Sequence, residues 1–118
     1  MAYMLLILEP RGQRAARTQE EGLAAWDSMN AFADDLKARD ILKAVASLKP
    51  DAQGARVQVR GTKSTVFDGP FAEAKEMVGG FFLLDCETKE QALAIARQCP
   101  AAQWATVEVR EVGPCYIA

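Results

Sequence analysis

Residues 4–8 read Met-Leu-Leu-Ile-Leu, a continuous apolar run that ends at the turn-forming residues 9–12, Glu-Pro-Arg-Gly. A short apolar run bounded by turn residues is typical of a β-strand that is buried on both faces. A second run of this kind, Phe-Phe-Leu-Leu at residues 81–84, lies late in the chain. The two runs predict two central strands of one sheet.

The segment after the first strand has the pattern of an amphipathic helix. Thr18 followed by Glu21 forms a capping box, and apolar residues then recur every three or four positions. We predict a helix over residues 19–39. Its apolar stripe is expected to pack against the sheet, and it comprises Leu23, Trp26, Met29, Phe32 and Leu36.

Further elements follow at regular intervals. Residues 41–48 are interpreted as a strand because a turn signal follows at 49–54, with continuation of the helix as the alternative. Residues 56–60 and 65–67 predict a hairpin, and residues 71–76 a single helical turn. A capping box at Thr88 starts a second helix that Pro100 stops, and the alternating residues 106–110 predict the last strand.

The order of these elements predicts a ferredoxin-like α+β sandwich in one domain over residues 1–118. A chain of 118 residues has no room for a second independent core. Two helices cover only one face of such a sheet, whereas both apolar strands are predicted to be buried on both faces. A homodimer in which two sheets face each other would supply the missing cover.

Composition excludes several classes of function. Fourteen Lys and Arg residues against sixteen Asp and Glu give a net charge of −2, which disfavours direct contact with nucleic acid. The first apolar run is too short for a membrane span and lacks the basic residues of a secretory signal, so we expect a cytoplasmic protein without membrane contact. With no histidine and three widely spaced cysteines, we predict free buried thiols, no metal site and no cofactor.

Residues 68–76, Asp-Gly-Pro-Phe-Ala-Glu-Ala-Lys-Glu, are followed by Gly79-Gly80 and two phenylalanines. This stretch closely resembles the signature of the DGPF branch of the YCII-related proteins. The resemblance extends to residues 3–7, to the helix containing Trp26, and to residues 99–102 and 107–110, and so covers nearly the whole chain. It implies a dimeric α+β barrel and a gene neighbourhood with extracytoplasmic-function sigma factors. Better-described YCII relatives resemble lyases or dehalogenases with a His-Asp pair, which this chain cannot supply.

The same stretch holds our candidate catalytic residue, Asp68. A carboxylate beside glycine and proline at a strand end can be fixed and aimed into a cleft, and partial burial would suit it to proton transfer. Phe71, Lys75, Arg60 and Arg56 are the candidate ligand-binding residues. The alternative is structural: Asp68 forms an Asx-type turn, and Phe71 fills the core.

Two other features have a functional and a structural interpretation. Arg11, Arg14 and Arg17 could form an anion-binding rim after the first strand, or they could belong to a solvated loop. Gly79-Gly80 precedes a strand, so it indicates a bulge or a close backbone approach, not a dinucleotide site.

Two hypotheses of function follow. The first is a homodimer with a small-molecule cleft in each half, in which catalysis is possible. The second is a non-catalytic regulatory or interaction module that works with a sigma factor. A concave pocket with converging polar groups would favour the first hypothesis, and a filled barrel the second.

Overall fold

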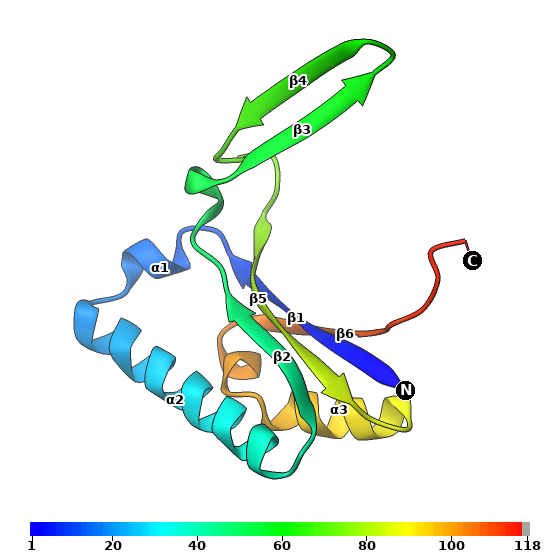
Figure 1. The fold of residues 1–118 in the computed structure, drawn as a ribbon. Coiled ribbons are helices and arrows are strands. Elements are labelled where there is room, and N and C mark those ends of the chain that lie inside the picture. Colours follow the sequence, from blue (N-terminus) through cyan, green and yellow to red (C-terminus); the bar gives the residue numbers. More distant parts are fainter. Residues whose placement is uncertain (117–118) are drawn as a thin grey trace.

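The computed structural model describes residues 1–116, so the last two residues of the predicted domain lie outside the described part of the chain. One strand and two helices come first, four strands follow, and a helix and a strand close the chain (Figure 1). The helices are α1 (Gln13–Ala16), α2 (Gln19–Ala38) and α3 (Lys89–Gln98). The strands are β1 (Ala2–Pro10), β2 (Leu42–Ser47), β3 (Ala55–Arg60), β4 (Lys63–Asp68), β5 (Glu76–Asp85) and β6 (Thr106–Glu111).

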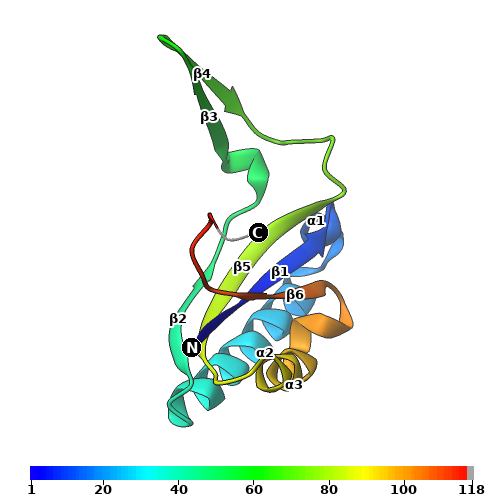
Figure 2. The same cartoon turned by 90° about the vertical axis from the view of Figure 1, so that its right-hand side faces the viewer.

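Four strands form one antiparallel sheet in the order β2-β5-β1-β6. The two longer helices, α2 and α3, lie on the same face of this sheet (Figure 2). Along the chain, the β3–β4 hairpin is inserted between β2 and β5. This arrangement confirms the ferredoxin-like α+β fold.

The helix boundaries follow local sequence signals. Both predicted capping boxes are present, with the Thr18 and Thr88 hydroxyls accepting from the backbone N–H groups of Glu21 and Gln91. Asp40 has a left-handed φ of 58° immediately after α2, which ends the helix and lets β2 begin. Residues 41–48 are therefore largely strand, and the alternative of a continued helix is wrong. The predicted helical turn at 71–76 is also wrong. The Ala74 N–H donates to the Phe71 carbonyl, which forms one isolated turn without helix, and Glu76 already belongs to β5.

The two faces of β1 differ within a single chain, and the expected burial of both faces depends on the homodimer, which stays a prediction. Tyr3, Leu5 and Ile7 point to the helices and are buried. Alternate residues, including Met4 and Leu6, are only half-buried because no helix of the described residues covers that face. We call this the outer face of the sheet.

The core lies between the sheet and the helices. Leu36 is fully buried, and the Phe32 and Phe82 rings meet edge to face with their centroids 5.3 Å apart. Trp26, predicted to lie in the core, is 52% exposed, so that prediction is wrong. The reason is that the first half of α2 borders an open cleft, whereas the second half packs on the sheet.

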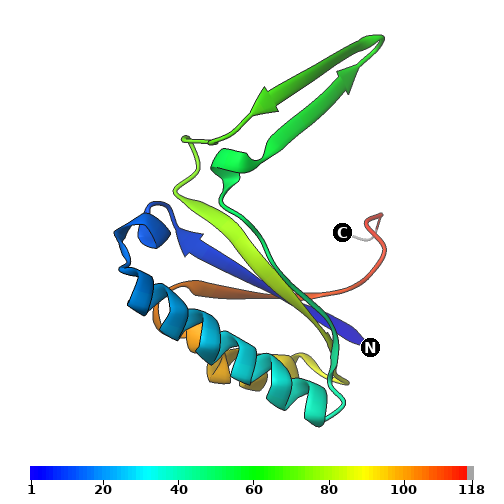
Figure 3. The ribbon, with the colours of Figure 1, turned by 60° about the vertical axis from the view of Figure 1, so that its left-hand side comes forward.

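The β3–β4 hairpin, residues 55–68, projects from the body of the protein as an arm (Figure 3). The radius of gyration is 16.1 Å, larger than the about 13.5 Å expected for a compact chain of this length. Val57, Val59 and Val66 on the arm are exposed. No helix in residues 1–116 is long and apolar enough to cross a membrane.

The packing of α2 leads to a stability prediction. Leu36→Ala should lower the free energy of unfolding by about 2–5 kcal/mol, because it opens a cavity in the core. Trp26→Ala should lower it by about 1 kcal/mol or less, as surface substitutions do. Chemical denaturation measures both values, and a larger loss for Trp26→Ala than for Leu36→Ala would place the tryptophan in the core after all.

Candidate functional site

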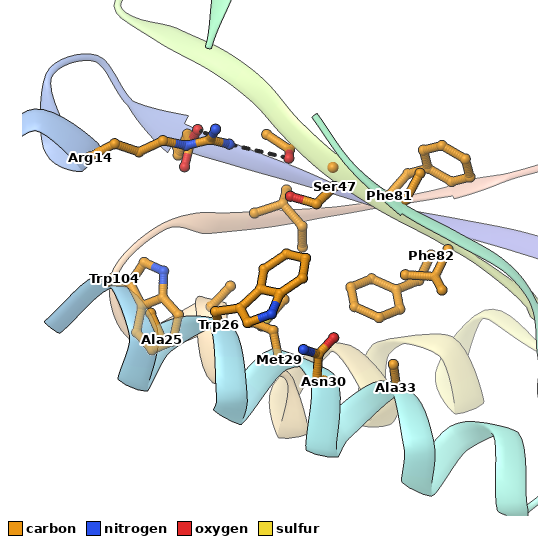
Figure 4. Close-up of a pocket in the computed structure, with 18 of the residues that line it drawn as sticks. Arg14, Ala25, Trp26, Met29, Asn30, Ala33, Ser47, Phe81, Phe82 and Trp104 are labelled. Carbon is orange, nitrogen blue, oxygen red and sulfur yellow. Dashed lines mark hydrogen bonds and ion pairs between the residues drawn. The ribbon is translucent and has the colours of Figure 1, made fainter. Parts of the chain in front are cut away.

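An open cleft lies between the first half of α2 and the sheet and has a volume of about 300 Å³ (Figure 4). The end of β1, α1, β2 and β5 supply its upper wall, and α2 with Trp104 supplies the lower one. Most of the lining is apolar. The polar groups come from Glu9, Arg14, Arg17, Asn30 and Ser47.

A buried ion pair stands in the upper wall. The Glu9 side chain is 7% exposed, and its Oε1 lies 2.7 Å from Nη2 of Arg14. This contact does not have the direction of a hydrogen bond, and within residues 1–116 Oε1 receives no hydrogen bond. The oxygen is therefore neutralised by a neighbouring charge and has no hydrogen-bond donor among the described residues.

Local sequence explains how the pair forms. Glu9 follows Tyr3, Leu5 and Ile7 on the helix-facing side of β1, so the strand's alternation turns its carboxylate inward. Gly12 then adopts a φ of 86° and turns the chain into α1, which carries Arg14 back over the strand end. The Arg14 Nη1 group donates to the carbonyl oxygen of Leu48 at 2.7 Å and so ties α1 to the chain after β2.

The glycine pair 79–80 makes room for these groups. A Cβ atom at residue 79 would lie 2.8 Å from Oε1 of Glu9, and one at residue 80 would lie 2.7 Å from the Ala46 carbonyl oxygen. The β1–β5 register also shifts here, between Ile7 and Leu8. The glycine pair was predicted to precede a strand, which is wrong because β5 already begins at Glu76, but the predicted bulge or close backbone approach is confirmed.

Two indole rings flank the lower part of the cleft. Trp26 rises from α2, and Trp104 lies beyond it toward the start of that helix (Figure 4). Gln13 Nε2 donates to the Trp104 carbonyl oxygen at 2.7 Å, which fixes this residue beside α1. The Arg17 guanidinium lies 5.6 Å from the centroid of the Trp104 ring, a cation–π contact at the cleft edge.

Arg11 holds the loop that contains residues 68–75 through hydrogen bonds. The Arg11 Nη1 group donates to Oδ1 of Asp51 at 2.8 Å, and its other nitrogens donate to the carbonyl oxygens of Phe71 and Ala74. The hydrogen bond from Arg11 lowers the pKa of Asp51. Gly69 is required because a Cβ there would meet the Asp51 carbonyl. These contacts make the loop a rigid connection between the arm and β5.

The predicted site residues do not gather in the cleft beside α2. Arg56 lies 3.7 Å from the Phe71 ring centroid in a groove at the base of the arm, and it pairs with Glu73 at 3.1 Å. Asp68, Arg60 and Lys75 are exposed outside both of these hollows. The catalytic role of Asp68 stays a prediction.

The sequence pattern does not identify three residues of the cleft. Glu9 stands beside turn residues, although its place two residues after Ile7 marks an inward-facing carboxylate. The helical spacing predicts Trp26 in the core, and no pattern marks Trp104. Of the three arginines after the first strand, Arg14 and Arg17 line the cleft while Arg11 holds the loop, and anion binding by them stays a prediction.

The cysteines follow the prediction in part. Cys86 and Cys99 are buried free thiols, and burial raises the pKa of each. Cys115 is exposed, which corrects the expectation that all three are buried.

The Arg11–Asp51 contact predicts a pH dependence of stability. Because the folded state lowers the pKa of Asp51, the carboxylate contributes stability at pH values above its unfolded pKa of about 3.9 and loses it as the pH falls through the folded value. Asp51→Asn should therefore destabilise the protein near neutral pH, and the difference from wild type should shrink below about pH 4. Denaturation at several pH values measures this, with the exposed Asp34→Asn as control. A difference that is constant with pH would contradict it.

The sequence of this chain is similar to the sequences of known proteins. The family model for the YCII-related domain matches residues 1–115. An uncharacterised protein from Rhizobium meliloti (strain 1021) is 31% identical over 106 residues, which cover 90% of this chain and 86% of that protein.

A similar solved structure is 5-chloro-2-hydroxyhydroquinone dehydrochlorinase from Burkholderia phenoliruptrix AC1100, in complex with 2,5-dihydroxybenzoquinone. It aligns with a TM-score of 0.55 over 96% of this chain and 94% of its own, at 14% identity, and so supports the fold. From the match over residues 1–115 and the curated relative, the chain belongs to the YCII-related family.

Proposed function

We propose that the protein binds a small, planar, hydroxyl-bearing molecule in the cleft between α2 and the sheet. The observation that carries this proposal is the buried Oε1 of Glu9, which lines the cleft and receives no hydrogen bond from residues 1–116. Leaving a buried carboxylate oxygen without a hydrogen-bond donor is costly. A ligand hydroxyl would supply the missing donor.

The aromatic lining favours a flat ligand. Trp26 is 52% exposed, although it stands on the helix side of the cleft among apolar residues. A ring entering the cleft would cover this indole and could stack on it, and aromatic pairs gain stability beyond that of simple burial. A volume of about 300 Å³ suits a single-ring compound.

The solved neighbour supports the same class of ligand. That protein is a dehydrochlorinase in complex with 2,5-dihydroxybenzoquinone, a hydroxylated ring. At 14% identity this likeness concerns the fold, and the residues that would recognise a ring in the present chain are its own.

Glu9 also provides a route to catalysis. When a ring hydroxyl donates to Oε1, its proton can move to the carboxylate and leave a phenolate oxygen on the ligand. The adjacent Arg14 guanidinium would remain to stabilise that negative oxygen. Proton abstraction by Glu9 is thus the reaction that we propose.

We further propose that the protein is a homodimer through the outer face of the sheet. Met4, Leu6 and Leu83 on that face are apolar and half-buried, and both long helices lie on the opposite side. A second sheet packed there would bury them and complete an α+β barrel.

The regulatory hypothesis and a cytoplasmic location stay predictions. A module that only holds a sigma factor does not need a cleft with a buried carboxylate, so the cleft favours ligand binding. The groove with Arg56 and Phe71 is the second candidate site, and it lacks a comparably buried polar group among its described residues.

A matched pair of ligands tests the ring-hydroxyl contact. By titration calorimetry, wild type should bind 4-hydroxybenzamide at least about tenfold more tightly than benzamide, which lacks the hydroxyl. Glu9→Met, which has no side-chain oxygen to accept from the hydroxyl, should remove most of this preference, whereas Glu73→Met, which changes a carboxylate outside the cleft, should preserve it. Equal binding of both compounds by wild type, or no binding of either, would contradict the proposal whatever the stability of the Glu9 variant.

Light scattering after size exclusion tests the dimer. Wild type should have about twice the chain mass of 12.9 kDa, and Leu6→Glu on the outer face should give a monomer. Leu23→Glu introduces the same charge at an exposed position on α2 and should remain a dimer. A wild-type monomer at micromolar concentration would reject the assembly.

A further inference from the structure

We infer that the ligand of this cleft carries a negatively charged group, and that Arg17 binds it. This inference rests on the proposed function and narrows the ligand to a hydroxylated ring acid. It follows from the charges that line the cleft and from the surroundings of Arg17.

The described lining of the cleft holds three ionisable side chains, and their formal charges do not cancel. Glu9 and Arg14 neutralise each other at 2.7 Å. Arg17 adds a positive charge, and no carboxylate of residues 1–116 lies within 4 Å of its guanidinium. The described lining therefore has a net charge of +1, which favours an anion.

Arg17 is held where it can act, and most of its hydrogen-bonding capacity remains free. The Trp104 ring lies 5.6 Å from its guanidinium carbon, and one Nη2 contact reaches Oε1 of Gln13 at 3.4 Å. A guanidinium has five N–H donors. The free donors and their flat arrangement suit a carboxylate, which can accept two parallel hydrogen bonds.

The capping box explains why Arg17 does not form an ion pair with Glu21. Glu21 lies one helical turn after Arg17, but its carboxylate accepts from the Thr18 backbone N–H at 3.0 Å. The Thr18 hydrogen bonds are the main cause of the lowered Glu21 pKa, and the Arg17 charge adds to it only weakly. Glu21 also lies outside the described lining of this cleft.

Glu9 and Arg17 thus define two ends of one binding site. Glu9 takes the hydroxyl at the sheet, and Arg17 takes the acid group at the edge near Trp104. The ring lies between them beside Trp26. A neutral phenol would fill the same space and leave the Arg17 charge without a partner.

The test compares two ligands that share the ring and the hydroxyl and differ in charge. By titration calorimetry, wild type should bind 4-hydroxybenzoate about tenfold more tightly than 4-hydroxybenzamide at neutral pH. Arg17→Gln should weaken binding of the acid by about that factor and leave binding of the amide nearly unchanged. Arg97→Gln, an exposed arginine on α3 outside the cleft, is the matched control.

The outcomes separate this inference from the function on which it rests. If wild type binds the acid and the amide equally, the anionic group is wrong and the ring-binding function stands. If Arg17→Gln weakens both compounds alike, Arg17 only shapes the cleft wall and the inference fails. If wild type binds neither compound, the proposed function itself fails.

Discussion

The ion pair between Glu9 and Arg14 is the contact on which the candidate site depends. It joins the end of β1 to α1, and Arg14 extends the connection to the carbonyl oxygens of Leu48 and Gly79. Three stretches distant in sequence, residues 9–14, Leu48 and Gly79, therefore meet at one buried charge. A buried carboxylate requires such a partner, because an unpaired charge in this position would destabilise the fold by several kcal/mol.

The stretch at residues 68–80 supports this pair from a distance. Arg11 fixes the loop through Asp51, and it lies two residues after Glu9 in the chain. The loop then delivers β5 in the register that places Gly79 against the carboxylate. Gly69 near its start allows the close approach to the Asp51 carbonyl, and the glycines at its end leave room for the Glu9 carboxylate and the Ala46 carbonyl.

Local signals in the sequence were sufficient for most of the fold. Capping boxes, apolar periodicity and turn residues identified α2, α3 and the sheet strands, because each signal acts within a few residues. The site depends on how deeply each side chain is buried, and the periodicity of a sequence does not specify the depth of burial. The same stripe of α2 holds buried Leu36 and half-exposed Trp26, and only the spacing between helix and sheet separates them. The glycine and proline beside Asp68 make it a visible candidate in the sequence. Glu9 faces inward only through ordinary strand alternation, which no motif marks.

The two tryptophans offer the most direct test, since the chain has no others and both line the cleft. In a two-dimensional ¹H–¹⁵N spectrum, titration with 4-hydroxybenzoate should shift both indole N–H signals, and both shifts should saturate with one dissociation constant. Backbone signals around Arg56 and Phe71 should stay in place. Unmoved indole signals, or shifts confined to the groove at the base of the arm, would contradict a binding site built around Glu9.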